Sequence, residues 1–366
     1  MKQPLIILFF LTTIGMGWMK AQSEEKSLVK WMTFQEALEK NKTQPKPFII
    51  DVYTDWCGWC KHMMKTTYSD QVIAQYINTW FYPVKFNAET TDTIFYQGKN
   101  YVNAGKGPRS THELAIKLLG NQLVYPTTLF ANYSNGFMLN TSGFLESNKL
   151  LPLLIYTVEN IYMSTQYENF EAGFNKTFVN PSKQAMSAPW NPIQKLGDKP
   201  TTEIISDNSK SNKNSKAGKT DKTKKDEATE TIKKKKIIFL YTDWCNGCKV
   251  MEKAVFEDTA ILKHFKKEFN LYSFNAEEKD SVKFSGKTYK NDGTNGTPFH
   301  NLAMEFTHNS LALPTCIVLD ENDKIINLIP QFLDIQVFNL VLNYYGKDVY
   351  KTENWNDYFA RNKPKN

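Results

Sequence analysis

Five cysteines stand out in this 366-residue chain, and four of them form two closely spaced pairs: Cys57 with Cys60, and Cys245 with Cys248. Two residues separate the members of each pair, so a disulfide within a pair closes only a tiny loop. Such a loop restricts the unfolded chain little and stabilises a fold poorly. The spacing instead suits thiol–disulfide exchange, in which one thiolate attacks a disulfide and its neighbour resolves the mixed disulfide.

The two pairs belong to an internal repeat with a constant offset of 188 residues. The run YTDWCGWCK at Tyr53–Lys61 returns as YTDWCNGCK at Tyr241–Lys249, and Phe-Asn-Ala-Glu and Pro-Thr steps recur at the same offset. A match of this length indicates duplication of a whole domain rather than a short solenoid repeat. From the repeat we predict domains at 28–170 and 235–360, joined by a largely disordered linker at 171–234. A signal peptide is predicted at 1–21.

The elements around each pair alternate between strand and helix. The apolar run Phe48–Tyr53 directly precedes the first pair and predicts a central strand buried on both faces. A helix is expected from Gly58 and a further strand at 81–86. An Asn-Gly turn at 135–136 predicts a hairpin, followed by a closing helix at about 148–162. This order predicts an α/β sandwich.

The first copy begins with an additional unit at Trp31–Phe34, which leads into a predicted helix. The second copy has no such unit, because a lysine run directly precedes its central strand at Ile237–Tyr241. Either the element is missing or another part of the chain supplies it. The stretch between the domains, at 173–205, contains Trp190 and several apolar residues, which would allow it to pack on one of the two domains.

Three features in each copy resemble the thioredoxin superfamily: Trp-Cys-x-x-Cys-Lys after an apolar strand, a Phe-Asn strand end, and Pro-Thr before a hairpin. The resemblance covers nearly all of both copies. It implies two tandem thioredoxin-like three-layer α/β/α sandwiches joined by a disordered Lys-rich linker. It also implies that Pro126 and Pro314 are cis and lie beside the cysteine pairs.

The cysteines receive their roles from their expected place at a helix start. The unpaired amides and positive dipole of a helix N-terminus favour a thiolate, so Cys57 is predicted to attack and Cys60 to resolve. By the same argument Cys245 attacks and Cys248 resolves.

The resemblance adds a buried acid beside the resolving cysteine, which matches Asp51, and an accompanying lysine, which matches Lys85. The second copy has Phe239 and Ser273 at these places. A buried carboxylate can relay the proton of the resolving thiol, and a nearby cation makes its burial tolerable. We therefore expect the first domain to be the efficient reductase and the second to be slower or differently poised.

The remaining candidates surround the cysteine pairs or lie in the predicted core. Cys316 is interpreted as a buried core thiol, and His112 and His300 as packed or surface histidines. Seven residues next to the cysteines or in the proline steps are predicted to contact substrate: Trp56, Trp59, Tyr125, Pro126, Trp244, Leu313 and Pro314.

Other classes of function would use the cysteine pairs differently. A zinc site built from both pairs is disfavoured, because each pair lies within its own complete repeat. No metal and no cofactor are therefore predicted. A redox-inactive peptide-binding or chaperone module on the same fold remains an alternative, as do a disulfide oxidase and an isomerase.

Charge and the amino-terminal residues bear on partners and location. The net charge is +7, but eleven lysines against five acids lie between Ser206 and Lys236, which disfavours nucleic-acid binding by the folded parts. Lys2, an apolar run at Pro4–Met16 and small residues around Ala21 predict a cleaved signal peptide. A secreted or periplasmic protein is expected, with protein thiols and disulfides and an upstream membrane or periplasmic electron donor as partners.

Overall fold

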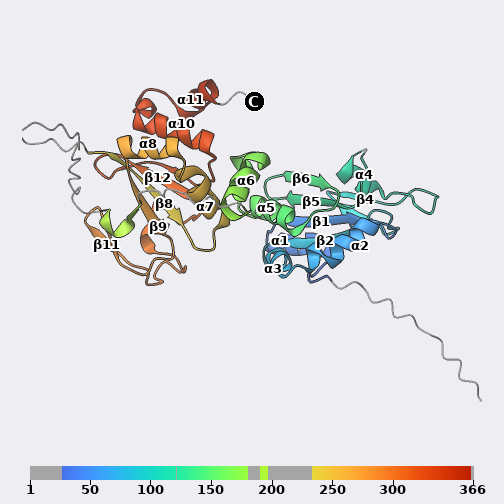
Figure 1. Ribbon diagram of the computed structural model, residues 1–366. Coiled ribbons are helices and arrows are strands. Elements are labelled where there is room, and N and C mark those ends of the chain that lie inside the picture. The colour runs from blue at the N-terminus through green and yellow to red at the C-terminus, as the bar shows by residue number, and fades with distance from the viewer. Residues whose placement is uncertain (1–26, 121, 180–189, 197–232, 364–366) are drawn as a thin grey trace, which may run out of the picture. The chain divides into compact units, whose positions relative to one another are not determined.

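The computed structural model describes residues 27–120, 122–179, 190–196 and 233–363 (Figure 1). These residues form two compact units. The first runs to Leu129 and includes Leu139–Ser147, and the second consists of Phe130–Met138 and the chain from Asn148 onward. The predicted signal peptide and residues 180–189 and 197–232 of the predicted linker lie outside the described residues.

The elements of the first copy are a four-stranded sheet, a small hairpin and six helices. The sheet has the order β2-β1-β5-β6, with β1 (Phe48–Tyr53), β2 (Tyr82–Asn87), β5 (Thr127–Asn132) and β6 (Phe137–Ser142). An antiparallel hairpin pairs β3 (Ile94–Tyr96) with β4 (Lys99–Tyr101). The helices are α1 (Phe34–Thr43), α2 (Gly58–Lys65), α3 (Gln71–Trp80), α4 (Glu113–Leu119), α5 (Ser147–Val158) and α6 (Tyr167–Phe174).

The second copy repeats this order with one strand more. Its sheet has the order β13-β12-β8-β9-β7, with β7 (Asn191–Pro192), β8 (Lys235–Tyr241), β9 (Phe269–Asn275), β12 (Thr315–Leu319) and β13 (Ile325–Ile329). The hairpin is β10 (Val282–Phe284) with β11 (Lys287–Tyr289). The helices are α7 (Asn246–Met251), which continues as a π-helical turn to Phe256, α8 (Thr259–Glu268), α9 (Asn301–Phe306), α10 (Ile335–Gly346) and α11 (Trp355–Asn362).

The predicted elements of the first copy are confirmed. The expected central strand is β1, which is buried over nearly its whole length and pairs in parallel with β2. The expected closing helix is α5, which ends at Val158, four residues earlier than predicted. The α/β class and the duplication are therefore both present in the structure.

The two faces of the second sheet are covered by different elements. On one face, apolar side chains of β8, β9 and β12 form a core with α9, the β10–β11 hairpin, and Ile193 and Leu196. On the other, Phe239 packs on Phe256, which contacts Phe265 of α8 and Phe338 of α10. Covering of a sheet on both faces is the three-layer arrangement expected for a buried parallel strand pair.

The first strand of the second copy comes from the chain before the Lys-rich segment. Asn191 of β7 pairs in parallel with Tyr272, as Met32 bridges Val84 in the first copy. Tyr272 and Val84 are equivalent at the offset of 188. The open question about the missing element is thus answered, and residues 171–179 and 190–196 of the predicted linker are structured.

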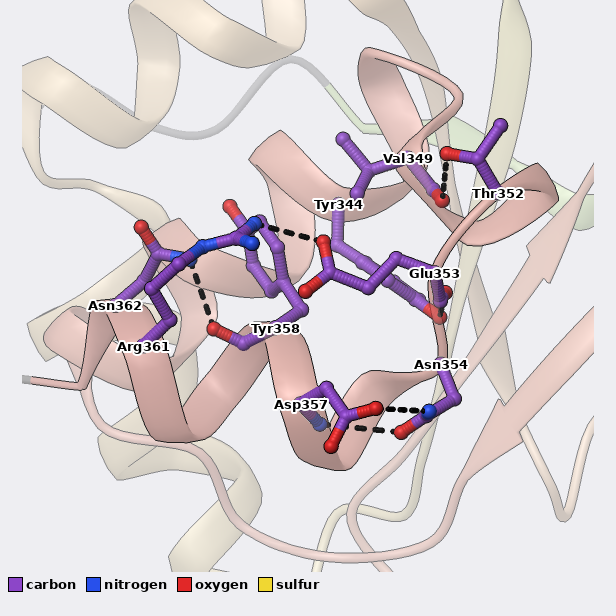
Figure 2. Close-up of polar contacts among 9 residues, drawn as sticks. All are labelled: Tyr344, Val349, Thr352, Glu353, Asn354, Asp357, Tyr358, Arg361 and Asn362. Atoms are coloured by element: carbon purple, nitrogen blue, oxygen red, sulfur yellow. Dashed lines mark hydrogen bonds and ion pairs between the residues drawn. The ribbon is translucent and has the colours of Figure 1, made fainter.

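Each copy ends in a helix held by the same tyrosine contact. The Tyr156 hydroxyl donates to the Thr165 carbonyl at 2.7 Å, and the equivalent Tyr344 hydroxyl donates to the Glu353 carbonyl at 2.6 Å. Figure 2 shows this contact together with the Arg361 guanidinium, which donates to the Glu353 carboxylate at 2.7 Å. Both the backbone carbonyl and the side chain of Glu353, just before α11, are therefore held by hydrogen bonds.

Tyr344→Phe is expected to lower the free energy of unfolding by about 1 kcal/mol, because the Glu353 carbonyl loses its buried donor while the ring is kept. Urea unfolding of the full chain measures this. Tyr350→Phe is the matched control, since its hydroxyl makes no hydrogen bond among the described residues. Equal midpoints for the two variants would contradict the assigned role of the hydroxyl.

Among the residues described here, no helix combines the length and apolar character that crossing a bilayer requires.

Candidate active sites

The first cysteine pair lies where β1 leads into α2. Cys57 caps α2 with extended backbone, and its sulfur accepts the amide N–H of Cys60 at 3.1 Å. The two residues form a disulfide, and both are nearly buried. The predicted position at the helix start is confirmed, so the amides and dipole of α2 act on the Cys57 sulfur when the pair is reduced.

The second pair has the same local geometry. Cys245 caps α7, its sulfur accepts the amide N–H of Cys248 at 3.1 Å, and the two cysteines form a disulfide. Cys245 is only 1% exposed, against 5% for Cys57. Both attacking cysteines are thus buried, and the repeated sequence produces the same local geometry twice.

The prolines predicted to be cis are cis. The Tyr125-Pro126 and Leu313-Pro314 bonds both have this geometry. The Tyr125 ring packs edge-on against the Trp56 ring, with centroids 6.2 Å apart, which joins the proline step to the residue before Cys57.

Asp51 is buried in β1, and neither of its carboxylate oxygens has a hydrogen-bond partner among the described residues. Burial raises its pKa to about 7, against the opposing effects of Lys85 and of the nearby Tyr68 hydroxyl. Lys85 pairs with Asp51 across β1 and β2, and its ammonium lies 4.8 Å from the Tyr53 ring centroid. The predicted acid and lysine are thus neighbours, and the lysine side chain is exposed.

The second copy replaces the buried acid with an aromatic cluster. Phe239 occupies the position of Asp51, and the Trp190 ring stacks on it with centroids 5.6 Å apart. Ser273 occupies the position of Lys85 and pairs with Pro192 of β7. No carboxylate stands at this place to take a proton from Cys248.

A glutamate holds the tryptophan before each attacking cysteine. The indole N–H of Trp56 donates to Glu89 at 2.8 Å, and that of Trp244 donates to Glu277 at 3.3 Å. The Arg109 guanidinium lies 5.0 Å from the Trp56 ring centroid. Sequence reasoning assigned no role to these glutamates, although their recurrence in both Asn-Ala-Glu runs was the available signal.

Trp59 takes part in an exposed cluster beside the first pair. Its ring lies 5.6 Å from that of Phe144 and 5.8 Å from that of His62, and 62% of the residue is exposed. We call Trp59, His62 and Phe144 the aromatic cluster. It offers an apolar surface next to Cys57.

Three residues whose role was open have structural places. His112 and His300 are buried helix caps, whose ring nitrogens accept the amide N–H of Leu114 and of Leu302, each at 3.1 Å. Cys316 is buried in β12, and burial raises the pKa of its thiol. The interpretation of Cys316 as a core thiol is confirmed.

Comparison with known protein families gives two matches in series. Residues 18–136 match the Thioredox_DsbH family, described as "Protein of unknown function, DUF255". Residues 222–346 match the Thioredoxin_2 family, described as "Thioredoxin-like domain". The chain contains two tandem thioredoxin-like domains. The cysteine pair of each domain lies within the matched residues.

Relatives of these thioredoxin-like domains include a thiol:disulfide interchange protein DsbD of Yersinia enterocolitica. It is 28% identical over 151 residues, which are 37% of this chain and 23% of the relative, so the chain spans about a quarter of that protein. Among solved structures, a DsbH oxidoreductase is 18% identical with a TM-score of 0.22, covering 35% of this chain and 82% of its own. The reduced C-terminal domain of Neisseria meningitidis DsbD is 20% identical with a TM-score of 0.25, and the match covers 34% of this chain and 92% of that domain.

Each of the two thioredoxin-like domains therefore has a disulfide-bonded cysteine pair at a helix start, which is the geometry that thiol–disulfide exchange requires. In such a site the cysteines themselves carry the electrons.

Proposed function

We propose that the chain reduces or exchanges disulfides of other proteins, chiefly through Cys57 and Cys60 of the first thioredoxin-like domain. The observation that carries this is Cys57 at the start of α2 with exposed aromatic side chains beside it. The domain limits that we propose remain 28–170 and 235–360.

The proposed reaction moves two electrons from the cysteine pair to the substrate. The Cys57 thiolate attacks one sulfur of a substrate disulfide, forms a mixed disulfide and releases the other sulfur as a thiolate. The Cys60 thiolate then attacks the Cys57 sulfur and releases the second substrate thiol. The domain is left with the Cys57–Cys60 disulfide, which an upstream membrane or periplasmic donor must reduce again.

Asp51 is proposed to accept the proton of the Cys60 thiol before the second attack. An acid with a pKa near the working pH is well suited to take up and return a proton, and burial raises the pKa of Asp51 to about 7. Lys85 is proposed to make the carboxylate form attainable in this buried position.

Substrate contacts are proposed for the residues that surround each pair. In the first domain these are Trp56, Trp59, Tyr125 and Pro126. In the second they are Trp244, Leu313 and Pro314. Exposure of Trp56, Trp59 and Trp244 supports the proposal, since each leaves about half or more of its surface free to contact a partner.

A secreted or periplasmic location is proposed from the amino-terminal residues, where Lys2 precedes the apolar run Pro4–Met16. The similarity to a thiol:disulfide interchange protein supports protein disulfides as the substrate class. Nucleic acid is not proposed as a partner.

An insulin-reduction assay with dithiothreitol tests the function. The full chain is expected to accelerate reduction, and the Cys57→Ser/Cys245→Ser double variant is expected to fall to the uncatalysed rate. Thiol titration of the unfolded, reduced protein checks that only the intended cysteines are lost. A wild-type rate equal to that of the double variant would favour the redox-inactive peptide-binding module instead.

A further inference from the structure

The surface next to the second cysteine pair is covered by the chain's own residues Glu159–Phe174, which we call the capping segment. Gly247 stands at the position of Trp59 in the repeat. Trp59 is 62% exposed, whereas Gly247 is buried. The surface at position 59 of the first site is therefore open to solvent, whereas the equivalent surface at position 247 of the second site is covered.

Glu159, which directly follows α5, binds the start of α7 with both carboxylate oxygens. One oxygen accepts the amide N–H of Asn246 at 3.1 Å, and the other accepts the amide N–H of Gly247 at 2.6 Å. The second oxygen also lies 3.8 Å from the Cys245 sulfur. The amide N–H groups of Asn246 and Gly247 therefore donate to the Glu159 carboxylate and are not free to bind the sulfur or a substrate.

The sequence of the second pair leaves room for this carboxylate. A Cβ atom on Gly247 would lie 2.4 Å from the Glu159 oxygen and 3.3 Å from the Ile161 side chain. In the first pair, a Cβ on Gly58 would meet nothing within 4 Å, and Trp59 projects its whole side chain. A side chain at position 247 would therefore displace the Glu159 carboxylate from this place.

The rest of the capping segment covers the positions that form the aromatic cluster of the first site. Phe332, equivalent to Phe144, is only 3% exposed, and its ring lies 5.6 Å from that of Phe170. Val250, equivalent to His62, is fully buried, and a Cβ on Gly173 of α6 would lie 3.1 Å from it. The apolar surface that is open beside Cys57 is therefore occupied beside Cys245.

The charge of Glu159 acts against the thiolate of Cys245. Helix-start amides stabilise a thiolate, and a carboxylate that takes these amides and adds negative charge removes that stabilisation. Burial raises the pKa of Glu159 to about 7, opposed by the two amide hydrogen bonds and by the charge of Lys249. Above neutral pH the carboxylate is ionised next to the sulfur.

We propose that Glu159 is a positioning residue of the second cysteine pair, which makes Cys245 a weaker nucleophile than Cys57 and keeps large partners away from the start of α7. The reaction that it modulates is the proposed disulfide exchange. Its effect on the thiol is a separate property, which is measured without any substrate.

Alkylation of Cys245 tests this in the full chain. In a Cys57→Ser/Cys60→Ser background, the reduced protein is treated with iodoacetamide at pH 6 to 10, and labelling of Cys245 is followed by peptide mass spectrometry. Glu159→Gln is expected to raise the rate at pH 8 by about tenfold and to move the midpoint of the rate–pH profile to lower pH, because a unit charge about 4 Å from the sulfur is removed.

Glu168→Gln is the matched control, since it removes the same charge from an exposed position of the capping segment. Gly247→Ala is a second variant that leaves the glutamate in the chain but displaces its carboxylate, and it is expected to shift the profile in the same direction. Identical profiles for Glu159→Gln, Gly247→Ala and Glu168→Gln would overturn the proposal. A shifted profile together with no insulin reduction by the wild type would overturn the proposed function alone.

Discussion

Cys57→Ser is expected to lower insulin reduction by the full chain by at least about tenfold, whereas Cys245→Ser is expected to keep most of the activity. The first pair has a buried acid to take the proton of Cys60, a contribution that typically amounts to 10²–10⁴-fold in general acid–base catalysis. The second pair has Phe239 in that place and Glu159 over its attacking sulfur. Initial rates at equal protein concentration measure the difference.

The control for this comparison is Cys316→Ala. Cys316 is buried in β12 and takes no part in either disulfide, so its removal leaves the insulin rate unchanged. Equal losses for Cys57→Ser and Cys245→Ser would show that the two pairs share the work. A larger loss for Cys245→Ser would reverse the assignment of the principal site.

The fold could be predicted because its signals are local and occur twice. A short apolar run before Trp-Cys-x-x-Cys is typical of a buried strand that leads into a helix, and the repeat at 188 residues gives two instances of it. Helix ends were less accurate, since α5 ends at Val158 where Glu159 and Asn160 turn the chain away. Asn160 has a left-handed backbone, for which the sequence offers only a weak cue.

The origin of β7 could not be derived from periodicity. Two residues, Asn191 and Pro192, make up the strand, and the whole Lys-rich segment separates them from β8. Trp190 indicated that this stretch packs somewhere, but its partner, Phe239, lies 49 positions further along the chain. A strand this short is recognised only through the strand that it pairs with.

One of the two differences between the sites could be predicted from the sequence, and the other could not. The loss of Asp51 and Lys85 in the second copy follows directly from the alignment of the repeats. The role of Glu159 does not follow from that alignment, because its contacts join residues that are 86 to 88 positions apart. The repeat does not preserve the glutamate either, since Lys347 stands at the equivalent position of the second copy. The exchange of Trp59 for Gly247 was the one available sign that something occupies this space.

Asp51→Asn is expected to slow disulfide reduction at pH 7 by about tenfold or more while it stabilises the protein at alkaline pH. The kinetic loss follows because an amide cannot accept the proton of Cys60. The gain in stability follows because the folded protein holds a buried carboxylate that has no hydrogen-bond partner among the described residues. Insulin reduction and urea unfolding of the same two proteins measure both effects.

The sign of the pH dependence comes from the raised pKa of Asp51, about 7 in the folded protein against 3.8 for an ordinary aspartate. As the pH rises above 4, the carboxyl ionises first in the unfolded chain, so the stability that it contributes is complete below that pH and is lost by about pH 7. A difference of roughly 3 pKa units corresponds to about 4 kcal/mol. The stability of Asp51→Asn relative to the wild type should therefore rise between pH 4 and 8. Above pH 8 this difference in stability should change little.

Asp55→Asn is the matched control, since Asp55 is exposed and lies just before the same cysteine pair. It is expected to lack the stability gain of Asp51→Asn, because Asp55 keeps its contact with water in the folded protein. A merely structural Asp51 would give the stability gain of Asp51→Asn without the slower reduction. Asp51 is the one carboxyl in β1. If Asp51→Asn reduces insulin as fast as the wild type at pH 7, the proton of Cys60 therefore leaves by a route that does not use Asp51.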